Sequence, residues 1–214
     1  LSRMTHAGYW VGRAIEVPGS RPLELEPRNH SGLPLLAWPA NHVIKCLVFY
    51  HPDDPLELRL AQEERVVELA RDAQALDREL LLEVVASGRG HAVDDATMAR
   101  VLRRFYNLGV QPAWWKLEPP SPAAWPRIQD VIMEFDPHCN GVLLLGLDAA
   151  ESRLRVAFEQ AAPFPICRGF AVGRSIFGVP AREWMRDELD DRGVIAAIAT
   201  RYERLIDIWR GLRP

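Results

Sequence analysis

Six short apolar runs, all but the first followed by a longer stretch with helical spacing, constrain the fold of this 214-residue chain more than any other feature. Their starts recur at intervals of roughly 27 to 37 residues, the length of a strand and a helix that returns along it. The run 141–146 is apolar throughout, as expected for a parallel strand covered on both faces. We therefore predict a parallel α/β sheet with strands at 9–17, 42–50, 79–86, 113–118, 140–147 and 169–174.

The segments between these runs have apolar residues at helical spacing and good helix starts. Capping aspartates or an early proline begin the first four of them, as in Asp53-Asp54-Pro55. We predict helices at 55–76, 94–107, 122–135, 149–161, 181–189 and 194–212. Residues 18–41 are rich in Pro, Gly and Asn and indicate a long irregular connection. With 48% hydrophobic residues, the whole chain, 1–214, suits a single domain with one core.

Two architectures fit this pattern, an open doubly wound sheet and a (β/α)8 barrel. A barrel is favoured because it places charged residues from several strands around one axis, as Lys45, Glu83 and Lys116 require. The chain shows six strands where a barrel needs eight. Together with the start at Leu1, this suggests that about two β/α units are absent from the N-terminal side. We expect a TIM-barrel type fold that is N-terminally incomplete or is closed by something outside the chain.

Only two of the 26 basic residues are lysines, and both lie in apolar strands. Lys45 and Lys116 occupy the centres of their runs, and Glu83 occupies the centre of the run between them. A desolvated lysine can lose its proton and become a nucleophile, whereas arginine keeps its charge. Because unpaired buried charge is costly, these three residues point to imine chemistry. The alternative is a codon bias towards arginine that leaves two lysines in structural ion pairs.

The surroundings of Lys116 suggest how the chemistry is divided. Pro119 ends its strand, which places Lys116 near the mouth where barrel active sites lie. Lys45 would lower the pKa of Lys116 further, and Glu83 would shuttle protons. This set predicts a class I aldolase, with Glu118 on the face of Lys116 as a substrate-binding residue. The competing interpretation is a Lys–Glu–Lys ion network that fills the centre of the barrel.

A phosphate site is the second signal. The run 169–178 ends a strand at Gly173-Arg174 and continues through Ser175 into a turn and a helix. Gly173 lets the backbone approach an anion, Arg174 adds charge, and a helix start offers free N–H groups. Gly146, at the end of the preceding strand, supplies the other half, in the place where barrels hold phosphate. The alternative is an ordinary tight turn.

Several classes of function are excluded by composition and motifs. The net charge of −3 shows no basic excess, so we expect no nucleic acid partner, and no apolar stretch approaches the ~20 residues of a membrane helix. The odd number of cysteines without a CxxC pair indicates reduced thiols and a cytoplasmic protein, with Cys46 and Cys167 in the core. The segments 51–54 and 136–139 are turn sequences without metal-site spacing, so we expect no metal. No nucleotide-binding motif is present, and we expect no cofactor.

Four runs resemble the aldolase-like domain that is fused behind the sugar kinase of myo-inositol catabolism, 5-dehydro-2-deoxygluconokinase. They are Val-Ile-Lys-Cys-Leu-Val-Phe-Tyr-His-Pro-Asp-Asp (43–54), Glu-Leu-Leu-Leu-Glu-Val (79–84), Phe-Tyr-Asn-Leu-Gly-Val-Gln-Pro-Ala-Trp-Trp-Lys-Leu-Glu-Pro (105–119) and Arg-Gly-Phe-Ala-Val-Gly-Arg-Ser-Ile-Phe-Gly (168–178). That domain is similar in turn to the class I tagatose-1,6-bisphosphate aldolases. The resemblance spans nearly the whole chain, and Trp-Trp-Lys-Leu-Glu-Pro is its most specific part.

The resemblance implies roles and a substrate. Lys116 would form the Schiff base, Glu83 would be the acid/base, and Lys45 a second essential cation. Gly173 and Arg174 would match the phosphate-binding loop. The implied substrate is 6-phospho-5-dehydro-2-deoxygluconate, split into dihydroxyacetone phosphate and malonate semialdehyde. A fused or associated sugar kinase and a homo-oligomer are expected. The alternative function is a non-catalytic phosphosugar-binding or scaffolding domain that supports a sugar kinase.

Overall fold

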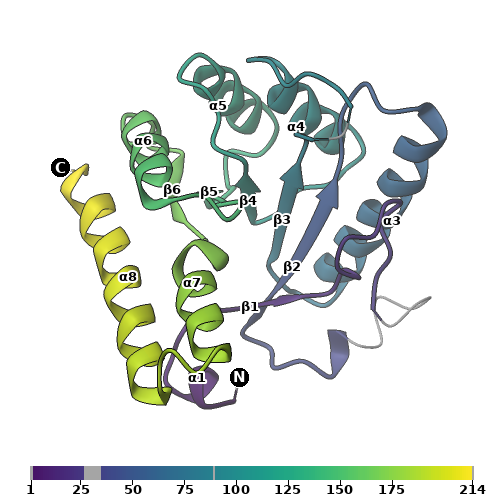
Figure 1. Ribbon diagram of the computed structural model, residues 1–214. Helices are drawn as coiled ribbons and strands as arrows, with labels where there is room; N and C mark the ends of the chain where they lie inside the picture. Colours follow the sequence, from purple (N-terminus) through teal and green to yellow (C-terminus); the bar gives the residue numbers. More distant parts are fainter. Residues whose placement is uncertain (1, 27–34, 89, 214) are drawn as a thin grey trace.

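Six parallel strands, each paired with the next along the chain, form the sheet of the computed structural model, which describes residues 2–26, 35–88 and 90–213 (Figure 1). In order they are β1 (Val11–Ala14), β2 (His42–Phe49), β3 (Leu80–Val85), β4 (Trp114–Leu117), β5 (Gly141–Leu144) and β6 (Cys167–Phe170). In a doubly wound sheet the strand order changes direction at one point, whereas here it runs from β1 to β6 without a reversal. This steady progression belongs to a β/α barrel and confirms the predicted fold type.

The helices alternate with the strands. They are α1 (Ser2–His6), α3 (Leu56–Ala75), α4 (Thr97–Asn107), α5 (Ala124–Phe135), α6 (Glu151–Ala161), α7 (Arg174–Met185) and α8 (Asp191–Gly211). Helices α3 to α6 follow one another around the outside of the sheet, and α8 lies beyond α7 and α6 (Figure 1). Among the described helices, none combines the length and the apolar content needed to cross a bilayer.

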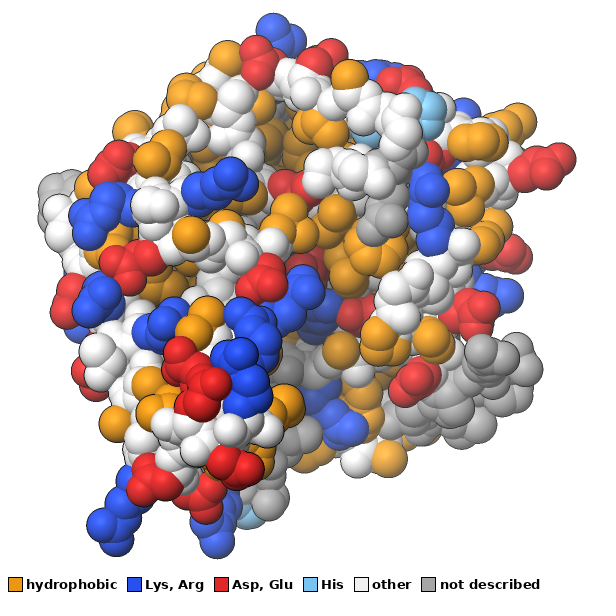
Figure 2. Space-filling view, in the orientation of Figure 1, with side chains coloured by type: hydrophobic (Ala, Val, Ile, Leu, Met, Phe, Trp, Pro, Cys, Tyr) orange, Lys and Arg blue, Asp and Glu red, His pale blue; other side chains and the backbone are white. Residues whose placement is uncertain are grey.

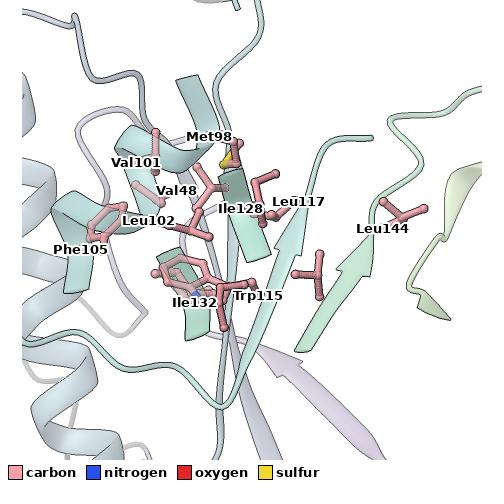
Figure 3. Close-up of a cluster of buried hydrophobic side chains, with 14 of the residues drawn as sticks. Val48, Met98, Val101, Leu102, Phe105, Trp115, Leu117, Ile128, Ile132 and Leu144 are labelled. Atoms are coloured by element: carbon pink, nitrogen blue, oxygen red, sulfur yellow. The ribbon is translucent and has the colours of Figure 1, made fainter. Parts of the chain in front are cut away.

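The core lies between the sheet and this outer layer of helices. Side chains alternate between the two faces of a strand, and the outward set is apolar. Trp115 and Leu117 of β4 are fully buried against α4 and α5 (Figure 3). The indole N–H of Trp115 donates to the hydroxyl of Tyr106 at 2.8 Å, which satisfies its one polar group. Cys46 and Cys167 are buried in the same core, as predicted.

The alternate positions of the same strands face the inner side of the sheet. Lys45, Glu83 and Lys116 occupy these positions, each between two fully buried apolar neighbours. The register pairs Glu83 of β3 directly with Lys116 of β4, and pairs Glu83 with Leu47 of β2 on the other side. Lys45 lies one alternating position before Leu47. The register therefore brings all three charges to one face.

The predicted end of the last strand is wrong. Residues 169–174 were expected to be a strand and 181–189 a helix, but β6 ends at Phe170 and α7 already begins at Arg174. Pro180 lies inside α7 and misled the prediction, since proline usually breaks a helix. Here α7 packs along α8, and this packing outweighs the hydrogen bond that Pro180 cannot donate.

The N-terminal segment also differs from the prediction. The strand expected at 9–17 is β1 at Val11–Ala14, followed by an isolated antiparallel bridge between Glu16 and Leu25. Helix α1 was not predicted. Of the irregular connection predicted at 18–41, residues 27–34 lie outside the described residues. In the described part, Arg21 Nη2 contacts Asp54 Oδ1 at 2.5 Å, which ties the segment to the loop after β2.

Candidate active site

One glutamate bridges the two lysines on the inner face. Lys45 Nζ lies 2.9 Å from Glu83 Oε2, and Lys116 Nζ lies 3.1 Å from Glu83 Oε1. Each carboxylate oxygen of Glu83 thus contacts a different lysine. The exposed fractions of the Lys45, Lys116 and Glu83 side chains are 21%, 15% and 10%. The three residues are therefore largely desolvated, yet both lysines keep some access to solvent.

A fourth charged residue, Glu16, joins this cluster and was not singled out in the sequence. Its Oε1 lies 2.5 Å from Lys45 Nζ. Its Oε2 is buried and has no hydrogen-bond partner among residues 2–26, 35–88 and 90–213. The register of the sheet accounts for its place: Ala14 pairs with Lys45, and Glu16 occupies the next alternating position after Ala14. A carboxylate at that position faces the same side of the sheet as Lys45.

The two lysines differ in their electrostatics. Burial lowers the pKa of Lys116, and the neighbouring charge of Lys45 lowers it further, while Glu83 opposes both without cancelling them. Burial also acts to lower the pKa of Lys45, but Glu83 and Glu16 outweigh it, and the pKa of Lys45 is raised. Lys116 therefore loses its proton more readily than an ordinary lysine, and Lys45 keeps its proton. The surroundings thus favour the neutral amine at Lys116 and the ammonium ion at Lys45.

Glu118, the predicted substrate-binding residue, is engaged by the turn after β3. Its Oε2 accepts hydrogen bonds from the backbone N–H groups of Ala86 at 2.7 Å and Ser87 at 3.0 Å. The hydroxyl of Ser87 donates to Oε1. Glu118 thus holds the turn that follows β3, at the carboxyl end of the strand that contains Glu83. Its contact with a substrate stays a prediction.

The two halves of the predicted phosphate site are adjacent. A Cβ on Gly146 would lie 2.9 Å from Ser175 Oγ, so the end of β5 and the start of α7 approach as closely as a glycine allows. The Ser175 hydroxyl is buried and has no partner in the described part of the chain. Gly173 is the N-cap of α7, and no side chain caps this helix. Unsatisfied N–H groups at a helix start favour an anion.

Arg174 and two other arginines surround a groove next to this helix start. The groove has a volume of about 340 Å³, and its polar lining consists of Arg174, Arg182, Arg201, Asp148, Glu151 and Ser175. Basic and acidic side chains lie next to one another around α7 in the face shown in Figure 2. In this structure Arg174 lies at the groove between α6, α7 and α8. Three arginines against two carboxylates leave the groove with a small excess of positive charge.

The two segments interpreted as turns are turns. The N–H of Asp54 donates to the carbonyl of His51 at 3.1 Å, and the N–H of Cys139 donates to the carbonyl of Asp136 at 3.1 Å. In the first turn, the N–H of His51 also donates to Asp54 Oδ2 at 3.0 Å. These polar residues therefore serve the local backbone, as their sequences predicted.

Comparison with known sequences places the chain in a family. Residues 1–213 match the family described as "Uncharacterized protein conserved in bacteria (DUF2090)". No curated protein matches the chain in sequence.

Several solved structures share the fold. A protein of Corynebacterium glutamicum superposes with a TM-score of 0.61 at 17% identity, over 92% of this chain and 63% of its own. The fructose-bisphosphate aldolase of Plasmodium falciparum gives 0.64 at 13% identity, over 100% of this chain and 72% of its own. An archaeal fructose-1,6-bisphosphate aldolase, solved with its catalytic Lys covalently bound to the carbinolamine intermediate, gives 0.59 at 14% identity, over 96% and 75%. This chain shares the fold of these proteins. It spans less than two thirds of the length of the Corynebacterium glutamicum protein and about three quarters of the length of the archaeal aldolase.

Proposed function

The chain belongs to the DUF2090 family, and we propose that it works as a class I aldolase, which cleaves a carbon–carbon bond through an imine on Lys116. One observation carries this proposal: a single glutamate contacts two lysines whose pKa values shift in opposite directions. Attack on a carbonyl needs a neutral amine, and only Lys116 is shifted towards that state. The likeness in fold to an aldolase with a carbinolamine on its lysine supports the assignment.

The proposed reaction begins with imine formation. The neutral amine of Lys116 adds to the keto carbon of the substrate, and a proton moves from nitrogen to oxygen to give a carbinolamine. Glu83, in contact with Lys116 Nζ, takes the proton that the Lys116 ammonium gives up on becoming neutral, and then delivers it to the carbinolamine hydroxyl, which leaves as water. The product is a protonated imine, whose positive nitrogen draws electrons from the adjacent bonds.

Cleavage follows from this electron demand. A base takes the proton of the hydroxyl on the carbon β to the imine carbon. The bond between the α and β carbons breaks, an aldehyde forms at the β carbon, and the electron pair moves to the imine to give an enamine. Protonation of the α carbon and addition of water then release the keto product and restore the free amine. The ammonium of Lys45 supplies a fixed positive charge beside Glu83 throughout.

The proposed substrate is a phosphorylated keto sugar acid. The sequence resemblance to the inositol-catabolism domain supports 6-phospho-5-dehydro-2-deoxygluconate, which would yield dihydroxyacetone phosphate and malonate semialdehyde. The start of α7, with Gly146 and Ser175 in close contact and Arg174 beside them, is the site we assign to the substrate phosphate. The same resemblance supports association with a sugar kinase domain and with further copies of the chain.

A second candidate function is a non-catalytic phosphosugar-binding domain. It is favoured by the ion pairs themselves, because Glu83 satisfies both lysines and such a network can be purely structural. The two functions differ in one respect that can be measured. Only the aldolase forms a covalent bond between a lysine and its ligand.

Trapping with borohydride tests the proposal. The full chain is incubated with dihydroxyacetone phosphate, reduced with borohydride and digested, and the peptide masses are measured. We expect the adduct on the peptide that contains Lys116, and none in Lys116→Arg. Lys45→Arg is the matched control, because it also replaces one of the two lysines but keeps the charge, and it should still be labelled on Lys116. Mass on Lys45, or no adduct in a folded protein, would refute the assignment.

A further inference from the structure

The two lysines of the site contact different numbers of carboxylates. Lys116 contacts one carboxylate, that of Glu83. Lys45 contacts two, those of Glu83 and Glu16. Glu83 is shared between the lysines, while Glu16 has Lys45 as its partner and a second oxygen that is buried. Among the described contacts, Glu16 thus pairs directly with Lys45, whereas the carboxylate of Glu83 is divided between the two lysines.

The backbone holds Glu16 in place. The N–H of Ile15 donates to the carbonyl of Lys45 at 3.1 Å, so the two residues move together. On the other side, Val17 and Glu24 bond through their backbones at 2.8 Å, around the bridge between Glu16 and Leu25. The glutamate side chain thus projects from a small double-stranded segment. These hydrogen bonds fix the backbone of Glu16 beside Lys45, so a change of side-chain rotamer is all that would be needed to make or break the ion pair.

We propose that Glu16 is a positioning residue of this site, which holds Lys45 as a permanent ammonium ion and so leaves Lys116 as the lysine that gives up its proton. The catalytic consequence rests on the proposed aldolase function. The charged groups that face Lys45 are Glu16 from the segment after β1, Glu83 from β3 and Lys116 from β4. Cys46, the next residue on β2, faces the core and does not compete, because burial raises the pKa of its thiol.

Loss of Glu16 would remove this distinction. Lys45 would remain largely buried but would then share Glu83 with Lys116. Two desolvated ammonium ions next to one carboxylate are unfavourable, and one of them would lose its proton at a lower pH. With Glu16 absent, nothing in the described contacts makes that lysine Lys116 in preference to Lys45. The division of roles between the lysines would therefore weaken.

The small number of lysines makes the inference directly measurable. Reductive methylation of the full chain with carbon-13 formaldehyde labels only Lys45, Lys116 and the terminal amine, since arginine does not react. Both lysine side chains are partly exposed and can be reached. Lys45→Arg and Lys116→Arg assign the signals. The pH at the midpoint of each methyl titration then reports each amine separately, without any need for activity.

We expect the wild-type Lys45 signal to titrate at a higher pH than the Lys116 signal. In Glu16→Gln, which keeps the shape but removes the charge, the Lys45 midpoint should fall towards that of Lys116. Glu134→Gln removes a surface carboxylate that pairs with Arg103 and should move neither signal. An unchanged Lys45 midpoint in Glu16→Gln would overturn the proposal, as would an equal fall in Glu134→Gln.

A second variant decides the matter if Glu16→Gln does not fold. Glu16→Asp keeps the charge but withdraws it by one methylene, so the Lys45 midpoint should fall part of the way. No fall would count against the proposal. The borohydride experiment is separate from this one. If the midpoints shift as expected but no adduct forms, Glu16 holds Lys45 and the aldolase proposal fails.

Discussion

The inner and outer faces of the same six strands differ sharply. On the outer face, Val84, Trp115 and Leu117 are fully buried against helices. On the inner face, Lys45 and Lys116 remain partly exposed and lie in contact with Glu83. The two sets alternate along each strand, so Lys45, Glu83 and Lys116 each have a buried apolar neighbour on either side.

This difference shows how the sheet separates stability from chemistry. Each large side chain buried on the outer face contributes roughly 1.5–3 kcal/mol to the free energy of folding. The inner face holds desolvated charges, which oppose folding unless they are paired. The outer face thus stabilises the strands that hold the charged residues in register. Substitutions on the two faces should therefore separate into effects on stability and effects on turnover.

The largest effect is expected on the inner face, from Glu83→Gln. Glutamine keeps the shape of the side chain but cannot carry a proton between carbinolamine and solvent. We expect turnover to fall by about 10²–10⁴-fold, the usual contribution of a general acid/base. Binding of the phosphosugar should change little, because proton transfer acts mainly in the transition state. Steady-state kinetics and equilibrium binding measure the two quantities separately.

Glu79→Gln is the control for Glu83→Gln. Glu79 lies just before β3 on the same face and accepts a hydrogen bond from the indole of Trp114 at 3.2 Å, which glutamine can also accept. Turnover should be unaffected. If both substitutions reduced turnover equally, the effect would reflect the charge of the inner face and not a proton carrier at Glu83.

The next largest effect is expected on the outer face, from Trp115→Ala. This change would leave a cavity under α4 and remove the hydrogen bond to Tyr106, and should lower the free energy of unfolding by about 3–5 kcal/mol. Trp114→Ala affects the neighbouring residue on the inner face, which is half-buried and packs edge-on against Trp10. Urea denaturation should show a smaller loss for Trp114→Ala. Equal losses would contradict the separation of the two faces.

The order of strands and helices could be predicted from the sequence because it depends on local patterns. The strand predicted at 42–50 is β2 at His42–Phe49, and Pro55 correctly marked the start of α3. The prediction failed at α7, which contains Pro180 and packs along the next helix, α8. Spacing along the chain does not report such contacts.

The candidate site could be predicted only in part for the same reason. Lys45, Glu83 and Lys116 stood out because a charge at the centre of an apolar run is unusual. Glu16 did not, because it lies at the end of a short strand and meets Lys45 only through the pairing of β1 with β2. The sequence singled out Lys116 by its place near the end of its strand, but it could not show how many carboxylates reach each amine.

A smaller effect is expected from Arg174→Gln. Loss of one charge-assisted contact should weaken binding of phosphorylated ligands by roughly tenfold to a hundredfold. Binding of the unphosphorylated sugar should not change. Arg210→Gln, an exposed arginine on α8, removes the same charge away from the site and serves as the control. Equal weakening for both ligands would show that Arg174 supports the fold.

The smallest effect is expected in the pH dependence of the rate at which borohydride traps the imine. This dependence separates the roles of Lys45 and Lys116 most directly. Lys116 must be neutral, so the rate should fall by up to about tenfold per pH unit below its lowered pKa. Lys45 must be charged, so the rate should fall again as pH rises through its raised pKa. Activity is then confined to the window between the two values. Lys45→Arg should abolish the basic limb alone, because arginine keeps its proton. Borohydride trapping rates over a pH series measure both limbs, and a loss of the acidic limb in Lys45→Arg would reverse the roles we assign to the two lysines.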